Sequence, residues 1–148
     1  MMSDDKLKII IPEINTESGL ARCGANVKIY LQSLSLFITN IPTALVKMRT
    51  FVNQCALVQQ SNVSEKDMKD YFTYAHSIKG MCDYIGAEDA RKNAKQLEDM
   101  AANGDLNGIL EHNDNFIKQI ERIIADIQEW LLTNEHDGNL SGKMSGTG

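Results

Sequence analysis

The segment from Ser64 to Ala87 reads SEKDMKDYFTYAHSIKGMCDYIGA. Its first four residues resemble a capping box with Asp67 in the usual position of Glu or Gln. Near its end, Gly86 can adopt the left-handed conformation that terminates a helix. At about 100° per residue, the apolar side chains between these signals form one stripe: Met68, Tyr71, Ala75, Ile78, Cys82 and Ile85. The segment therefore predicts an amphipathic helix that ends near Ile85 and packs one face into a core.

The same spacing of apolar residues by three and four continues on both sides of this segment. Further helices are expected at residues 26–38, 42–59, 87–103 and 106–132, with a short helical turn at 16–22. No segment alternates apolar and polar residues long enough for a convincing strand. The chain is therefore predicted to be all-α, an antiparallel four-helix bundle with an additional N-terminal helix.

Polar and conformationally special residues set the expected boundaries of these helices. Thr16 can cap the short turn, and Gly24 can end it. Residues 39–42, Thr-Asn-Ile-Pro, predict a break and a restart, because Pro42 suits a first helical turn. The predicted helix 87–103 presents mostly alanine inward, at Ala87, Ala90, Ala94, Leu97 and Ala101. These small side chains would permit close approach of a neighbouring backbone, although alanine is also simply a strong helix former.

Composition and charge narrow the domain organisation and the class of partner. The chain has 148 residues, 43% of them hydrophobic, and a net charge of −5, without the basic clusters of a general nucleic-acid binder. No apolar stretch predicts a transmembrane helix. We expect an extended lead at 1–15, in which Ile9–Ile11 either crosses the domain surface or pairs weakly, a helical domain at 16–133, and a disordered tail at 134–148.

The three cysteines are widely spaced and odd in number: Cys23, Cys55 and Cys82. This pattern argues against a disulfide framework and against a zinc knuckle. Buried thiols in a reducing cytoplasm are the simplest interpretation.

His76 is the histidine with a distinctive position. Helical geometry places it roughly 140° from the centre of the apolar stripe, so it should face solvent in the middle of a helix. Lys79 and Gly80 follow three and four residues later and are therefore its neighbours on the helix surface. An exposed imidazole would thus have a cation and a bare patch of backbone beside it. His112 and His136 have no such neighbours.

A longer string surrounds His76. It runs Ala75-His76-Ser77-Ile78-Lys79-Gly80, then Gly86-Ala87, Leu97-Glu98, Ala101 and Gly104-Asp105. This string closely resembles the histidine-containing phosphotransfer (HPt) domain of bacterial phosphorelays. The stretch before this string resembles the lead of HPt modules attached to hybrid sensor kinases. The residues that match in this lead are Ile14, Gly19-Leu20-Ala21-Arg22, Gly24, Tyr30, Leu34 and Phe37. The whole resemblance covers roughly residues 10–132.

The resemblance implies a phosphocarrier of a two-component phosphorelay. His76 would exchange a phosphoryl group with the aspartate of a response-regulator receiver domain, and Lys79 would partly neutralise the phosphate. The receiver would supply magnesium, and this chain would bind no cofactor or metal of its own. No ATP-binding glycine loop is present in the sequence, so autophosphorylation is not expected. A cytoplasmic monomer is expected, either a free carrier or a module of a hybrid histidine kinase, without nucleic-acid or direct membrane contact.

Other residues near His76 have two interpretations each. Phe72 either belongs to a receiver-docking surface with Gly80 or fills a groove against the adjacent helix. Asp83 is also expected at this receiver-docking surface, and it either pairs with Lys79 and competes with phosphate or is an ordinary solvated residue. The basic run of Arg91, Lys92 and Lys95 either steers an acidic receiver or forms a solvated face. Met81 and Cys82 depart from the small residues that commonly follow Lys-Gly in the family.

Two other functional classes compete with the phosphocarrier. A helical interaction module with the same fold would bind partners without phosphorylation, and it would have no need of His76. A metal-binding bundle enzyme would need inward ligands such as Glu-x-x-His, which this sequence lacks.

Overall fold

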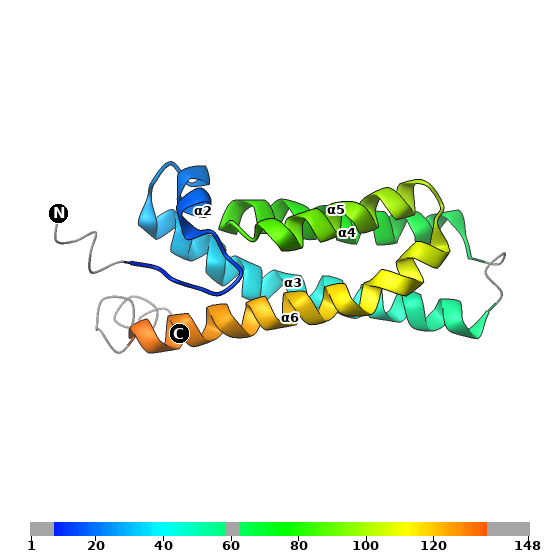
Figure 1. Cartoon of the computed structure of the whole chain (residues 1–148). Helices are drawn as coiled ribbons and strands as arrows, with labels where there is room; N and C mark the ends of the chain where they lie inside the picture. The colour runs from blue at the N-terminus through cyan, green and yellow to red at the C-terminus, as the bar shows by residue number, and fades with distance from the viewer. Residues whose placement is uncertain (1–7, 59–62, 136–148) are drawn as a thin grey trace.

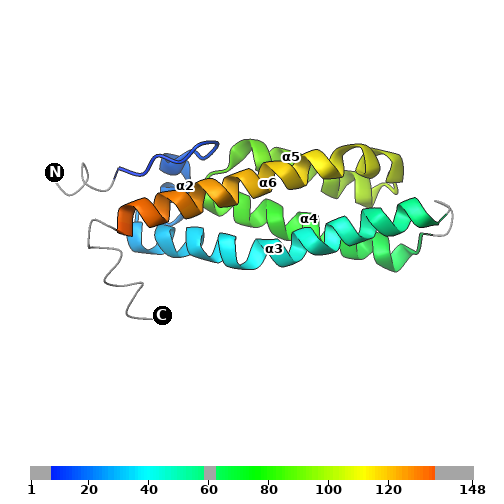
Figure 2. The same cartoon turned by 90° about the horizontal axis from the view of Figure 1, so that it is seen from below.

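A computed structural model describes residues 8–58 and 63–135 of the chain. This part contains the helices α2 (Thr16–Arg22), α3 (Val27–Leu57), α4 (Glu65–Ile85), α5 (Glu88–Ala102) and α6 (Leu106–Glu135), and no strand. Helices α3 to α6 lie along one long axis, and consecutive helices run in opposite directions (Figures 1 and 2). Helix α2 packs at the end where α4 turns into α5. The predicted four-helix bundle with an additional N-terminal helix is confirmed.

The core forms where the apolar stripes of the four long helices meet. Tyr71, Ala75, Ile78, Cys82 and Ile85 of α4 are all buried, as their spacing predicted. Ser64 caps α4 by accepting a hydrogen bond from the Asp67 amide, and Gly86 ends it with a φ of 87°. The inward alanines of α5 are buried as well, which lets α4 and α5 lie side by side in both views (Figures 1 and 2).

The predicted break at residues 39–42 is wrong, because α3 is one helix with Pro42 inside it. Proline removes one backbone hydrogen bond, yet Pro42 lies on the exposed side of the helix. On the opposite side the buried stripe continues without interruption through Phe37, Ile41 and Leu45. Packing of that stripe therefore outweighs the local preference of proline for a helix start.

Two smaller predictions of helix boundaries are also wrong. Asn15, not Thr16, caps α2, since its side chain accepts a hydrogen bond from the Ser18 amide. Helix α6 extends to Glu135, so residues 134 and 135 are helical rather than part of a tail. The remainder of the expected disordered tail, 136–148, lies outside the described residues.

The described part of the expected lead, residues 8–15, crosses the domain and contributes to its core, whereas residues 1–7 lie outside the described residues. Ile9 and Ile11 are buried, whereas Ile10 is 68% exposed. The Thr16 hydroxyl donates to the Ile9 carbonyl at 2.7 Å, and the Asn15 amide donates to the Gly86 carbonyl at 2.8 Å. Of the two arrangements left open for this apolar triplet, the structure shows the first.

Helix α3 is long and rich in apolar residues. Among the described residues it is long and apolar enough to cross a membrane, with a mean hydropathy of 1.4 over its most apolar window. Core helices of soluble proteins pass the same test, so length and composition alone are weak evidence. Eight side chains of α3 are buried in this bundle, and 28% of its most apolar window is buried.

Candidate functional site

His76 lies in the middle of α4 with its side chain 60% exposed. Its ring stacks on Phe72, one helical turn earlier, with centroids 6.0 Å apart and an interplanar angle of 7°. Phe72 is half-buried and packs against the hydrophobic core. The imidazole is therefore presented to solvent from a rigid position, as helical geometry predicted.

Glu98 of α5 lies beneath this histidine and is buried, with 4% of its surface exposed. One of its carboxylate oxygens accepts a hydrogen bond from His76 Nδ1, and the other accepts one from Lys79 Nζ at 2.8 Å. Burial alone would raise the pKa of Glu98, but the hydrogen bonds from Lys79 and His76 outweigh it and lower that pKa. Glu98 is consequently ionised at neutral pH and joins the two residues singled out from the sequence.

The contact with Glu98 determines which nitrogen of His76 is reactive. A carboxylate can only accept hydrogen bonds, so Nδ1 must carry the proton of the neutral ring. The lone pair of the neutral imidazole then lies on Nε2, on the other side of the ring. His76 thus has the tautomer and the exposure of a nucleophile.

The sequence alone does not predict the role of Glu98, although Leu97-Glu98 belongs to the motif. One signal was available. Glu98 is spaced by four from Ala94 and by three from Ala101, so it borders the inward stripe of its helix. A carboxylate in such a position needs a cationic or hydrogen-bonding partner.

The structure shows neither of the two arrangements considered for Asp83, pairing with Lys79 or simple solvation. Lys79 forms an ion pair with Glu98, whereas Asp83 forms an ion pair with Arg22 of α2 at 3.1 Å. Asp83 also lies 3.9 Å from Arg91 of α5. Asp83 therefore does not compete for Lys79, and it links three helices instead of being an isolated solvated residue.

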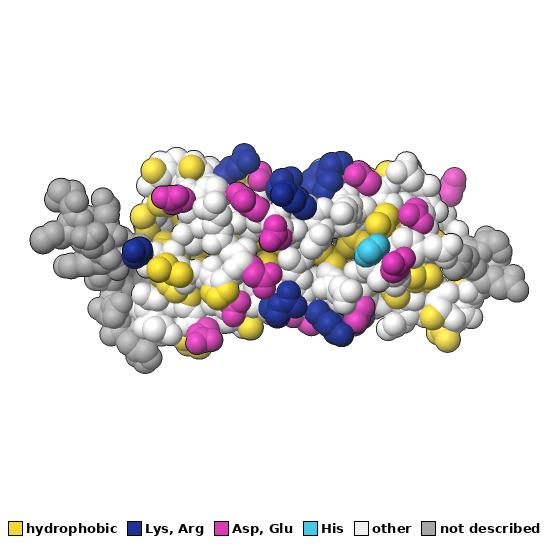
Figure 3. Space-filling view, viewed as in Figure 1, with side chains coloured by type: hydrophobic (Ala, Val, Ile, Leu, Met, Phe, Trp, Pro, Cys, Tyr) yellow, Lys and Arg dark blue, Asp and Glu magenta, His cyan; other side chains and the backbone are white. Residues whose placement is uncertain are grey.

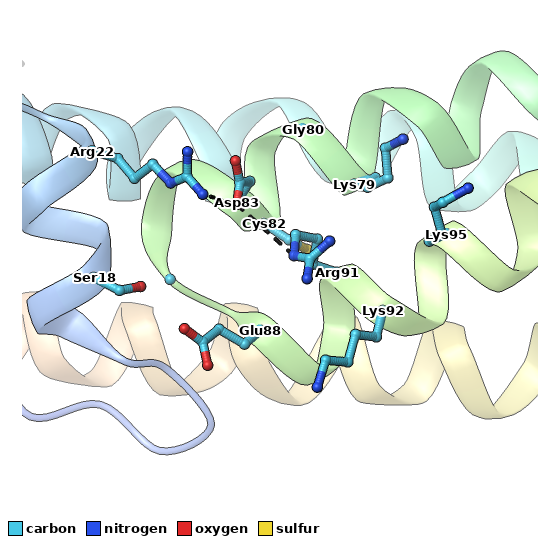
Figure 4. Close-up of a pocket in the computed structure, with 11 residues that line it drawn as sticks. Ser18, Arg22, Lys79, Gly80, Cys82, Asp83, Glu88, Arg91, Lys92 and Lys95 are labelled. Atoms are coloured by element: carbon cyan, nitrogen blue, oxygen red, sulfur yellow. Dashed lines mark ion pairs between the residues drawn. The ribbon is translucent and has the colours of Figure 1, made fainter.

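Gly80 faces open space, since a Cβ atom built on it would have no neighbour within 4 Å. Together with Lys79 it lines a groove of about 650 Å³ between α2, α4 and α5. The basic residues Arg91, Lys92 and Lys95 line the same groove (Figure 4). Figure 3 shows Lys and Arg side chains gathered along the upper edge of the molecule, over α4 and α5.

The remaining candidates lie apart from this site. His112 lines a different groove, between α5 and α6, and His136 lies outside the described residues. The three cysteines are free and buried. Within residues 8–58 and 63–135, no three His, Cys, Asp or Glu side chains are grouped so that they could hold a metal ion.

Comparison with known families identifies the family to which the chain is similar. The sequence model of the family described as Hpt domain matches residues 32–137, more than two thirds of the chain. The matched range contains His76, Lys79, Gly80 and Glu98, whereas α2 precedes it. No curated protein and no solved structure matches the chain.

Proposed function

The chain belongs to the Hpt domain family, and from that membership we propose that it carries a phosphoryl group on His76 within a phosphorelay. Hpt domains are phosphotransfer modules of two-component signalling, and they act as phosphocarriers rather than catalysts. They interact in general with receiver domains and kinases. The observation that supports His76 as the carrier is its exposed ring, held at Nδ1 by the buried Glu98.

The proposed step is the transfer of a phosphoryl group from a receiver aspartate to His76. The lone pair on Nε2 attacks phosphorus, a P–N bond forms, and the P–O bond to the aspartate breaks. The aspartate leaves as a carboxylate with the bonding electron pair. The ring then carries a phosphoryl group on Nε2 and a proton on Nδ1, and the resulting positive charge is offset by the Glu98 carboxylate. The reverse sequence returns the phosphoryl group to an aspartate.

Lys79 has two roles in this proposal, one toward Glu98 and one toward the phosphoryl group. Its ammonium group is bound to Glu98 and its side chain is 24% exposed, so it remains close to the ring without covering it. As the phosphoryl dianion forms, Lys79 can neutralise part of its charge. Magnesium is supplied by the receiver partner, and this chain contributes positioning and charge.

Gly80 and Phe72 belong to the proposed contact surface for the receiver. The open space above Gly80 lets a partner's backbone approach the imidazole, and Phe72 offers a partly exposed ring next to it. We further propose that the chain has no ATP site of its own and acts as a monomer. We also propose that it is cytoplasmic, because Hpt domains are typically soluble and cytoplasmic.

The test is phosphoryl transfer from a phosphorylated receiver domain in the presence of magnesium. We expect an acid-labile, base-stable phosphate on the native chain and none on His76→Gln. His112→Gln is the matched control, because it removes another exposed histidine and should label normally. A small phosphodonor such as phosphoramidate gives a measurement that is independent of the partner. If neither donor labels His76, the protein is a helical interaction module instead.

A further inference from the structure

The groove beside His76 is basic on a molecule that is acidic as a whole. Five basic side chains line it, one of them Lys79 already paired with Glu98, and only two acidic ones, Asp83 and Glu88, although the chain carries a net charge of −5. The basic set comprises Arg22, Lys79, Arg91, Lys92 and Lys95. Asp83 lies within ion-pair distance of two guanidinium groups, so it does not neutralise both. The Lys95 pair with Asp99 is exposed and is weakened by solvent.

The position of the groove relates it to the phosphoacceptor. Lys79 and Gly80 lie three and four residues after His76, so the groove begins within about one helical turn of the imidazole. From there it extends along α4 to Gly86, with α2 on one side and α5 on the other (Figure 4). A partner that covers Nε2 of His76 and continues over Gly80 would therefore enter the groove.

The wall formed by α2 is held firmly against the bundle. A Cβ on Gly19 would lie 2.5 Å from the Ile85 carbonyl oxygen, which shows how closely α2 packs on the end of α4. The Asn15 amide donates to Gly86, and Asp83 holds the Arg22 side chain. Arg22 is thus presented in a defined position, 56% exposed, from a helix that lies outside the range matched by the family.

We propose that this groove docks an acidic segment of the receiver domain, and that Arg22 together with Arg91, Lys92 and Lys95 determines which receivers the chain accepts. This inference rests on the proposed function. Charge complementarity favours an acidic occupant, since the rest of the acidic molecule repels such a partner and the groove attracts it. Attraction at this place also orients the partner so that its aspartate arrives over His76.

A binding measurement tests the docking site without a cognate receiver. The probe is a hexaglutamate peptide, titrated at low salt into the ¹⁵N-labelled full chain. We expect amide shifts concentrated at Ser18, Gly80, Gly86 and Arg91, and their loss in the variant Arg22→Gln/Arg91→Gln/Lys92→Gln. The matched control Lys28→Gln/Lys47→Gln/Lys118→Gln removes the same charge from α3 and α6 and should keep the shifts. Absence of shifts, or shifts spread equally over α3 and α6, would overturn the docking site.

A transfer measurement tests the selectivity. With the receiver that transfers fastest, the groove variant should lose about tenfold in transfer rate at low salt, and the loss should shrink at 0.5 M salt. Labelling by phosphoramidate should stay normal in both variants. If the groove variant accepts phosphate as fast as the control, the groove has no part in docking while the carrier function stands. If phosphoramidate and receivers all fail to label the native chain, the proposed function itself fails.

Discussion

At the scale of single residues, one buried carboxylate organises the site. Glu98 receives a hydrogen bond from His76 and another from Lys79, and it reaches both from the neighbouring helix. The same contact stabilises the fold, because it joins α4 to α5, and in the proposed function it prepares the phosphoryl transfer, because it leaves the lone pair on Nε2. Stability and reactivity should therefore change together when Glu98 is altered.

Glu98→Gln should lower the free energy of unfolding at pH 7 by about 1–3 kcal/mol, since a charge-assisted hydrogen-bond pair is lost. The sign of the pH dependence follows from the lowered pKa of Glu98. Its stabilisation is fully present above the ordinary carboxyl pKa and is lost as pH falls through the lower, folded value. Urea denaturation from pH 7 to pH 3 should show the gap between native and variant closing. A constant gap would contradict this assignment, and Asp99→Asn on the exposed side of α5 is the control.

Gly80→Ala should separate stability from transfer. Alanine is favoured over glycine by about 1 kcal/mol inside a helix, and a Cβ here meets no other atom within 4 Å. The variant should therefore unfold at a higher temperature than the native chain. Transfer from a receiver should slow down, because the partner loses its close approach, while phosphoramidate labelling is unchanged. A variant that is stabilised and transfers at the native rate would show that Gly80 is not part of the contact surface.

At the scale of helices, the end of α4 is fixed by groups from a distant part of the chain. The Tyr30 hydroxyl of α3 donates to the Ile85 carbonyl at 2.8 Å in a buried position. Burial raises the pKa of Tyr30 well above its ordinary value, so the hydroxyl stays protonated and can donate. Gly86 follows directly, and a Cβ there would lie 2.0 Å from the Asn15 carbonyl oxygen. The turn between the two helices of the site is thus tied to α2 and α3.

Tyr30→Phe should test this tie with little change in shape. It leaves the Ile85 carbonyl without its buried partner, and we expect the free energy of unfolding to fall by about 1–3 kcal/mol. Tyr84→Phe is the matched control, because Tyr84 is 58% exposed and should leave stability unchanged. Equal urea midpoints for the two variants would mean that the hydrogen bond contributes nothing measurable.

At this scale, the sequence predicts the features that local interactions determine. Helix α4 was predicted almost to the residue, because a cap, an apolar stripe and a terminal glycine all act locally. Pro42 misled the prediction, because the packing that keeps α3 continuous comes from other helices. The role of Glu98 depends on how α5 lies against α4, and the pairing of Asp83 depends on α2. Neither relation is encoded in the spacing along one helix.

At the scale of the whole molecule, the folded unit extends beyond the range that the family shares. The match begins at residue 32, yet residues 8–31 supply part of the core, one wall of the groove and the contacts that hold the turn after α4. Glu13 also reaches α6 through an ion pair with Arg122 at 3.3 Å. The lead and α2 are therefore structural parts of this domain, placed where they can influence the partner surface.

The lead offers a matched pair of substitutions to test this claim. Ile11 is 3% exposed and Ile10 is 68% exposed, although they are adjacent and chemically identical. Ile11→Ala should lower the free energy of unfolding by about 2–5 kcal/mol through lost burial and an unfilled cavity, whereas Ile10→Ala should stay within about 0.5 kcal/mol of the native chain. If both variants unfold at the native urea concentration, the lead does not belong to the cooperative core. The groove wall formed by α2 would then lack the support that the docking proposal requires.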